Sequence, residues 1–206
     1  MVGAVHVERV GPPGPQVVEI GEDAGRTALL VDGVVQSISP ADGLASGGYW
    51  AAMVPGHPPQ RALILGLGGG TLARLIQARW GTDVTIVGVD DDAAIVETAR
   101  AVGWLPPAGL ELVLADAFAY VQACSERFDY VAVDLFRGEQ VVGRVFTKPF
   151  LRRVRALLEP RGWLVVNFFR DARAEDRQAR IAGLGFDLRA CVGVGGNVVV
   201  HAQRRR

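Results

Sequence analysis

The sequence predicts an α/β fold built on a mostly parallel sheet, and three observations carry this prediction. From Arg61 onward, short apolar runs typical of buried strands alternate with amphipathic runs typical of helices. The first of these strands runs directly into a glycine-rich turn at 66–70, and a helix follows. The chain ends in two β-prone runs separated only by residues 193–196. Strict alternation of strand and helix gives right-handed βαβ units and hence parallel strands.

Residues 1–55 are predicted to form a small antiparallel β-sheet region that precedes the main domain. Its β-prone runs cover 17–20, 27–31 and 34–38, and Asp32-Gly33 separates the last two. An Asp-Gly pair between apolar runs is a strong hairpin signal. Prolines and glycines around 55–59 mark the join, so we expect a second, larger domain at 56–206.

The main domain is expected to alternate strands and helices as far as the last quarter of the chain. The helix at 71–80 is typical, because its apolar residues fall on one face. The predicted strands are 62–65, 84–89, 110–114, 130–133 and 163–168, and the predicted helices are 71–80, 93–102, 117–124 and 146–158.

The end of the chain breaks this alternation. The runs 186–192 and 197–201 are joined by a loop too short for a crossover helix, so they must pair antiparallel. A dinucleotide-binding Rossmann domain ends with another parallel strand. A mostly parallel seven-stranded sheet that ends in an antiparallel hairpin is instead typical of the Rossmann-like fold of class I S-adenosylmethionine-dependent methyltransferases.

Composition narrows the class of protein. Twenty-two basic residues balance 22 acidic ones, so net charge gives no reason to expect a nucleic-acid or membrane partner. Cys124 and Cys191 define neither a disulfide framework nor a zinc site, and no His/Cys cluster predicts a metal. We find no charged-then-apolar leader and no apolar run near 18 residues, and we therefore expect a cytoplasmic protein.

The glycine-rich turn predicts a cofactor that contains a nucleoside. Gly66, Gly68 and Gly69 would let the backbone approach a ligand closely, and the following helix would point free N–H groups at the same place. Asp90 ends the next strand, where a carboxylate suits the hydroxyls of a ribose, and Asp91 is the alternative for that role. The same glycines also fit a plain tight turn, and acids at this position also favour a helix start.

Two further acids end the third and fourth predicted strands. Asp116 would accept the adenine amino proton while the N–H of Ala117 reaches a ring nitrogen. Asp134 lies where the reacting end of the cofactor is expected, and there a partly dehydrated carboxylate would hold an amine or take its proton. The structural alternative for both acids is capping of the helix that follows.

Four residues are expected to line the acceptor pocket. Tyr49 and Trp50 precede the join between the domains, and their aromatic rings would hold apolar or cationic groups. Core packing explains them equally well. Phe136 and Arg137 follow Asp134 on one loop, where Arg137 would bind an anionic acceptor.

Together these residues resemble the spermidine synthase (polyamine aminopropyltransferase) family. The resemblance runs from Val17 to Phe168. It rests on a hairpin motif, the glycine-rich loop, an adenine-contacting pair and a strand with the catalytic aspartate: Leu30-Val31-Asp32-Gly33-Val34-Val35-Gln36, Leu63–Leu72, Asp116-Ala117 and Phe128–Asp134. The resemblance implies that Gln36 touches the cofactor, that Asp134 sits at the reacting centre, and that the N-terminal hairpins form a homodimer surface.

The chain departs from the family at positions where the family usually carries acids. Gly68 stands in place of an aspartate in the glycine-rich loop, and Leu135-Phe136-Arg137 follows Asp134 without a second aspartate. A polyamine is a multiply charged cation, and capturing it needs several carboxylates. We therefore expect a methyltransferase that uses S-adenosylmethionine on an unidentified small-molecule acceptor.

Three other functions stay open at this point. The first is polyamine biosynthesis by a true aminopropyltransferase, which would use decarboxylated S-adenosylmethionine. The second is a non-catalytic module that binds a nucleoside. The third is a nicotinamide-dependent dehydrogenase, which the terminal hairpin and the absence of a Tyr-x-x-x-Lys pair disfavour.

Overall fold

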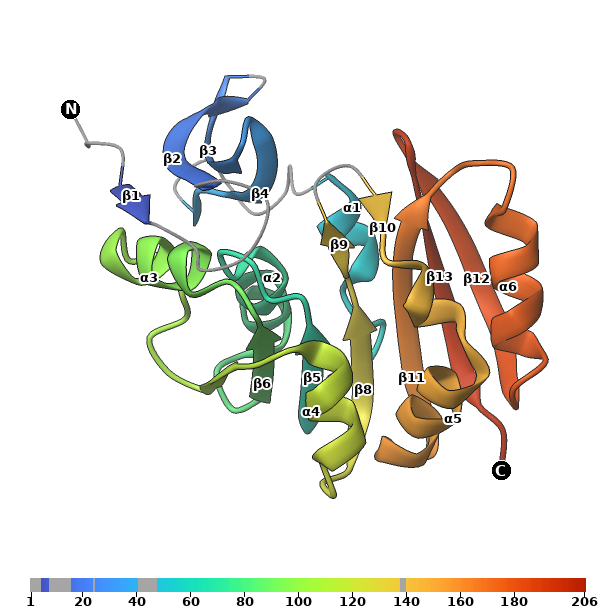
Figure 1. The fold of residues 1–206 in the computed structure, drawn as a ribbon. Helices are drawn as coiled ribbons and strands as arrows, with labels where there is room; N and C mark the ends of the chain where they lie inside the picture. The colour runs from blue at the N-terminus through green and yellow to red at the C-terminus, as the bar shows by residue number, and fades with distance from the viewer. Residues whose placement is uncertain (1–4, 8–15, 24, 41–47, 138–139) are drawn as a thin grey trace.

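The computed structural model describes residues 5–7, 16–23, 25–40, 48–137 and 140–206, and it places two main sheets one above the other (Figure 1). The smaller sheet is antiparallel, and its strands follow chain order. They are β1 (Val5–Val7), β2 (Gln16–Asp23), β3 (Arg26–Val31) and β4 (Val34–Ile38). This arrangement confirms the predicted small antiparallel sheet.

The larger sheet has seven strands in the order β12-β13-β11-β8-β5-β6-β7. Its strands are β5 (Arg61–Leu65), β6 (Thr85–Asp90), β7 (Leu110–Leu114), β8 (Phe128–Val133), β11 (Leu158–Phe169), β12 (Phe186–Val194) and β13 (Asn197–Arg204). The first five pair in parallel, whereas β13 runs antiparallel to both β11 and β12. The predicted fold class is therefore confirmed, including the terminal hairpin.

Helices cover both faces of this sheet (Figure 1). They are α1 (Gly48–Met53), α2 (Thr71–Trp80), α3 (Ala93–Ala101), α4 (Ala117–Ala123), α5 (Lys148–Leu157) and α6 (Ala174–Ala182). Helices α4, α5 and α6 pack their apolar side chains on one face, around Val131, Val133 and Phe168. Helices α1 and α2 pack on the other face, around Ile64 and Tyr130. Alternate residues of each strand thus serve two separate cores.

The small sheet is fixed to the main domain by α2 and α3. Val18 and Leu29 of the small sheet share an apolar cluster with Ile95 of α3 and with Trp104. Thr71, the first residue of α2, accepts a hydrogen bond at Oγ1 from the Ile38 amide at 3.1 Å. These contacts hold the small sheet over the carboxyl ends of the parallel strands (Figure 1).

The structure differs from the predicted elements in several places. The helix predicted at 146–158 is divided into a 3-10 turn (Gly143–Phe146) and α5, because Thr147 has an extended backbone before Pro149. The next strand begins at Leu158, with an irregularity before Trp163. Helices α1 and α6 and strand β1 were not predicted. A short hairpin of β9 (Phe136–Arg137) and β10 (Gln140–Val141) also follows β8.

Candidate functional site

The glycine-rich loop joins the carboxyl ends of three neighbouring strands. The Gly66 amide donates to the Val89 carbonyl of β6 at 2.9 Å, and the Asp134 amide donates to the Leu65 carbonyl of β5 at 2.8 Å. Gly66 has a φ of +88°, and a Cβ there would collide with the Asp134 carbonyl oxygen. Only glycine allows this close approach. The loop therefore lies between the carboxylates that end β6 and follow β8.

The Asp90 carboxylate supports the loop from the end of β6. Its Oδ2 accepts a hydrogen bond from the Gly68 amide at 2.8 Å, and its Oδ1 accepts one from the Asp92 amide at 2.9 Å. Burial raises the pKa of Asp90, whereas these two hydrogen bonds lower it and the nearby charges of Asp91 and Asp92 raise it. Each carboxylate oxygen can accept a second hydrogen bond. The residue can therefore hold the two hydroxyls of a ribose while it supports the loop.

The side chain of Asp134 lies immediately beyond β8, next to the loop. Its Oδ1 accepts a hydrogen bond from the Asn167 side-chain amide at 2.8 Å. Burial raises the pKa of Asp134 to about 6, hydrogen bonds from Asn167, Tyr49 and Trp50 oppose this rise, and the charge of Asp90 adds to it. A carboxylate with this pKa is ionised at neutral pH but binds a proton far more readily than an ordinary aspartate. It is suited to proton transfer.

Helix α1 brings both predicted aromatic residues to Asp134. The rings of Tyr49 and Trp50 lie with their centroids 4.4 Å apart. Trp50 is part of the core, as its structural interpretation predicted, and it also donates a hydrogen bond to Asp134. Burial, followed by the charge of Asp134, raises the pKa of Tyr49 well above its usual value, so its hydroxyl stays a donor.

Strand β4 of the small sheet covers the glycine-rich loop. A Cβ at Gly68 would lie 3.0 Å from the Gln36 carbonyl oxygen, and one at Gly69 would lie 2.6 Å from the Ser37 Cβ. Gln36 is the extra residue at an irregularity in the pairing of β3 and β4. Such bulges redirect a side chain. Gln36 was predicted to contact the same cofactor as the glycine-rich loop. In the structure its backbone lies against that loop.

The remaining predicted residues lie around this centre. Asp116 caps α4, with its Oδ1 accepting from the Ala119 amide at 2.8 Å, and Ala117 is buried at the start of the helix. One oxygen of the Asp116 carboxylate is thus used to cap the helix, which is the structural alternative to adenine binding. Asp91 and Arg137 form an exposed ion pair at 3.9 Å.

Phe136, on the hairpin that follows β8, packs its ring edge-on against Phe169 with the centroids 5.1 Å apart. Arg137, whose predicted role is to bind an anionic acceptor, lies in this structure beside the Asp91 carboxylate. The pair is exposed and weak.

Two residues of the site were missed by the sequence argument, Asn167 and Asn197. Asn167 is buried near the end of β11, and it interrupts the apolar run Leu164–Phe169. A polar residue inside a buried strand needs a hydrogen-bond partner, and this signal was available in the sequence.

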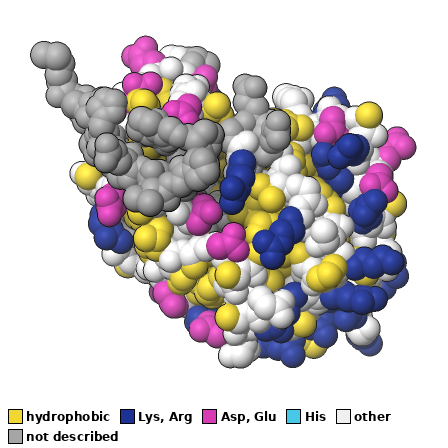
Figure 2. Space-filling model, viewed as in Figure 1, with side chains coloured by type: hydrophobic (Ala, Val, Ile, Leu, Met, Phe, Trp, Pro, Cys, Tyr) yellow, Lys and Arg dark blue, Asp and Glu magenta, His cyan; other side chains and the backbone are white. Residues whose placement is uncertain are grey.

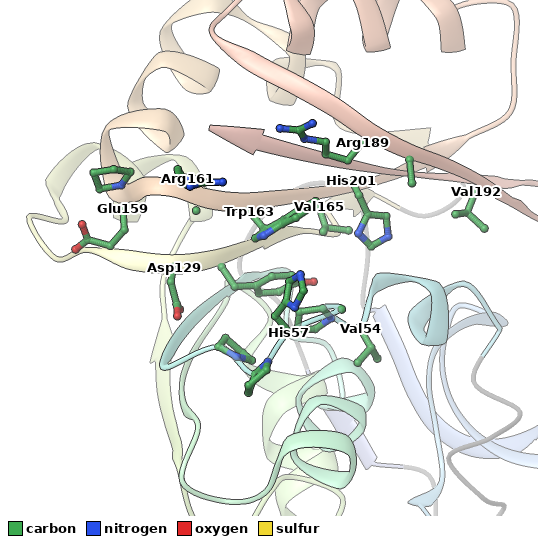
Figure 3. Close-up of a pocket in the computed structure, with 18 residues that line it drawn as sticks. Val54, His57, Asp129, Glu159, Arg161, Trp163, Val165, Arg189, Val192 and His201 are labelled. Atoms are coloured by element: carbon green, nitrogen blue, oxygen red, sulfur yellow. The ribbon is translucent and has the colours of Figure 1, made fainter. Parts of the chain in front are cut away.

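The structure also contains a cavity, and Figure 3 shows the side chains that line it. Its volume is about 480 Å³, and Trp163, His57 and His201 are among the residues that line it. It sits where β8 and β11 begin, whereas the loop and its carboxylates lie where the parallel strands end. Asp134 is not among the residues that line this cavity.

The described part of the chain contains no cluster of three His, Cys, Asp or Glu side chains arranged for a metal ion. None of its helices is long and apolar enough to cross a membrane.

Comparison with known proteins identifies the family to which this geometry corresponds. The model of the spermine/spermidine synthase domain matches residues 50–168. A polyamine aminopropyltransferase of Chromobacterium violaceum is 33% identical over 152 residues, which cover 71% of this chain and 58% of that protein. One of Neisseria meningitidis is 33% identical over 113 residues, covering 54% of this chain and 43% of that protein. The chain thus spans about half the length of these relatives.

Solved structures show the same fold. A probable spermidine synthase of Corynebacterium glutamicum matches with a TM-score of 0.74 at 18% identity, over 98% of this chain and 80% of that one. A spermidine synthase in complex with the transition-state analogue AdoDATO matches with a TM-score of 0.75 at 18% identity, over 98% of this chain and 73% of that one.

These matches contradict the expected methyltransferase on an unidentified acceptor, since the curated relatives are named for aminopropyl transfer. The argument for methyl transfer counted acids only at the positions where the family usually has them. Asp90 and Asp134, both predicted at neighbouring strand ends, lie close enough for their charges to interact, and the acids missing elsewhere in the motifs did not decide which group is transferred.

Proposed function

Because this chain belongs to the spermine/spermidine synthase family, we propose that it is an aminopropyltransferase that uses decarboxylated S-adenosylmethionine and a polyamine acceptor. The observation that carries the proposal is the Asp134 carboxylate, held beside the glycine-rich loop with a pKa of about 6. Such a group binds a cationic amine and can take its proton.

The residues around the loop fit the nucleoside part of this donor. Asp90 would accept hydrogen bonds from the ribose hydroxyls with the oxygen positions that the Gly68 and Asp92 amides leave free. Gln36 would contact the nucleoside from the small sheet. Asp116 and Ala117, at the start of α4, would bind the adenine.

Asp134 is assigned the role of base. When bound, the donor supplies a carbon made electrophilic by its sulfonium sulfur. The acceptor nitrogen forms a bond to that carbon, the electron pair of the carbon–sulfur bond leaves with the sulfur, and the nitrogen gives its proton to Asp134. Tyr49 and Trp50 donate hydrogen bonds to the carboxylate and orient it, and orientation is a large share of the rate of such transfers.

The test is direct detection of the products. Purified protein is incubated with decarboxylated S-adenosylmethionine and 1,4-diaminobutane, and mass spectrometry follows methylthioadenosine and the aminopropylated amine. We expect both products in equal amounts, and we expect at least about a 100-fold slower reaction with Asp134→Asn. If neither product exceeds the level that Asp134→Asn gives, the proposed function is wrong.

A further inference from the structure

A chain of side-chain amides leads from Asp134 across two neighbouring strands. The Asn167 side-chain nitrogen lies 2.8 Å from Asp134 Oδ1, and the Asn197 side-chain nitrogen lies 2.9 Å from Asn167 Oδ1. Asn167 belongs to β11 and follows Val166, which pairs with Val133 just before Asp134. Asn197 is the first residue of β13. In the strand pairing Asn167 lies opposite Val199, so Asn197 is its diagonal neighbour.

The three side chains share one face of the sheet. Side chains alternate along a strand, so Asp134 lies on the same face as Ala132, and Asn167 on the same face as Val165. Ala132, Val165 and Val199 all belong to the core that α1 and α2 cover. The amides therefore approach Asp134 beneath α1, the helix that carries Tyr49 and Trp50.

The direction of these hydrogen bonds follows from chemistry. An ionised carboxylate only accepts hydrogen bonds, so Asn167 must face Asp134 with its NH₂ group. Its carbonyl oxygen then faces Asn197, which must also present an NH₂ group. Asn167 is buried, so the reverse orientation would set two acceptors against each other at Asp134 and two donors against each other at Asn197.

We propose that Asn197 is a positioning residue, whose NH₂ group fixes the Asn167 amide in the one orientation that donates to Asp134. The inference rests on the proposed function, in which Asp134 accepts the proton of the amine. Asn197 acts through Asn167 and touches neither the carboxylate nor the substrate.

Other ionisable groups also act on Asp134, and none of them lies on β11 or β13. They are Asp90 at the end of β6, Tyr49 on α1 and Tyr130 on β8. A change at Asn197 leaves all three in place, so its effect on Asp134 can be measured separately from theirs.

The variant Asn197→Asp replaces the donor with an acceptor at nearly the same size. The Asn167 amide is then expected to turn, so that its carbonyl oxygen faces Asp134 and the carboxylate loses a donor. We expect the pKa of Asp134 to rise by about one pH unit, and kcat to fall about 10-fold with little change in KM. Asn197→Ala removes the donor without supplying an acceptor, so a smaller change of the same sign is expected.

A double-mutant cycle separates the effect of turning the Asn167 amide from the direct effect of the negative charge that Asn197→Asp adds. In an Asn167→Ala background, Asn197→Asp has no amide to turn, and its effect on the Asp134 pKa should largely vanish. A shift that persists undiminished in that background, or a pKa of Asp134 in Asn197→Asp equal to that of the unmodified protein, would overturn the inference.

The pKa of Asp134 is measured without the reaction, by carbon-13 NMR titration of labelled aspartate carboxyls. The Asp134 signal is assigned by its loss in Asp134→Asn. This readout separates the two proposals. An Asp134 pKa that responds to Asn197 in a protein that forms no methylthioadenosine would overturn the proposed function and leave the role of Asn197 standing.

Discussion

The buried carboxylate of Asp134 destabilises the folded protein at neutral pH. Burial raises the pKa of Asp134 from an ordinary 3.8 to about 6, and the hydrogen bonds from its neighbours offset only part of the cost of burial. The folded chain therefore binds a proton at Asp134 more tightly than the unfolded chain does. The resulting stabilisation is complete below pH 4 and is lost as the pH rises through 6.

The variant Asp134→Asn should therefore be more stable than the unmodified protein at neutral pH. Asparagine has the shape of a protonated aspartate and can accept the same hydrogen bond from Asn167, but it never carries the buried charge. We expect a gain of about 1–3 kcal/mol in the free energy of unfolding at pH 7.5, and almost none at pH 4. Urea denaturation at both pH values measures it. A variant that is less stable at pH 7.5 would show that the carboxylate is not strained by burial.

The same pKa predicts how the proposed activity depends on pH. Only the ionised form of Asp134 accepts a proton, so the acidic limb of kcat/KM should rise with an apparent pKa of about 6. Steady-state rates between pH 5 and 8 in a buffer of constant ionic strength test this. The residual activity of Asp134→Asn provides the control, since it should lack this limb. A limb that survives in the variant would belong to another group.

The sequence identified the acids of the site better than it identified their partners. Asp90 and Asp134 were predictable because each follows an apolar run, and the ends of parallel strands meet at one edge. Asn197 was not predictable, because its distance from Asp134 depends on the order of β8, β11 and β13 in the sheet. The methyltransferase prediction failed because it rested on acids missing from the family's usual motif positions, and relatives named for aminopropyl transfer overturn it.

At the scale of the element, Arg74 of α2 fixes the glycine-rich loop. Its guanidinium donates to the carbonyl oxygens of Gly69, Trp104 and Ile38, which belong to the loop, the segment after α3 and strand β4. Burial lowers the pKa of Arg74 to about 10, so it remains charged at neutral pH. One side chain thus joins three segments that are distant in the sequence.

Replacement of Arg74 should loosen this junction. Arg74→Met keeps the aliphatic stem but leaves three carbonyl groups without their donor, and we expect a loss of about 2–4 kcal/mol in stability. Thermal denaturation measures the loss. Arg79→Met, on the exposed end of the same helix, is the matched control and should change stability by less than about 1 kcal/mol. Equal losses in the two variants would show that Arg74 has no special role.

Element boundaries were predicted well where hydrophobic periodicity determines them. Helix α2 has the predicted limits. The glycine-rich turn ends just before its first residue, and its apolar face packs against β5. Helix α1 has only six residues and was missed. Its stability comes from packing against α2, β11 and β13, which no local pattern reveals.

At the scale of the whole molecule, charge is distributed unevenly although it sums to zero. Lys and Arg side chains gather over the α5 and α6 side of the molecule (Figure 2). Arg144, Lys148 and Arg152 are exposed on this side. Helix α5 ends where β11 begins, whereas Asp90 and Asp134 lie at the carboxyl ends of the parallel strands. This separation of charge favours the approach of a cationic acceptor to the acids and not to the basic side.

The two sheets meet at the glycine-rich loop, so a nucleoside bound there should stabilise both of them. Gln36 and Ser37 of the small sheet lie directly against Gly68 and Gly69. Methylthioadenosine at about 100 times its Kd should stabilise the folded chain by about 2.7 kcal/mol. If Gln36 contacts the ligand, amide hydrogen exchange should slow at 34–38 as well as at 66–71.

Hydrogen-exchange mass spectrometry with and without methylthioadenosine measures this protection. Asp134→Asn should keep the protection of both segments, because the proposed role of Asp134 is toward the acceptor and not the nucleoside. Gln36→Ala should weaken binding and reduce the protection of β4 more than that of the loop. Protection confined to 66–71 in the unmodified protein would exclude the small sheet from the binding site, and the close packing of β4 on the loop would then be purely structural.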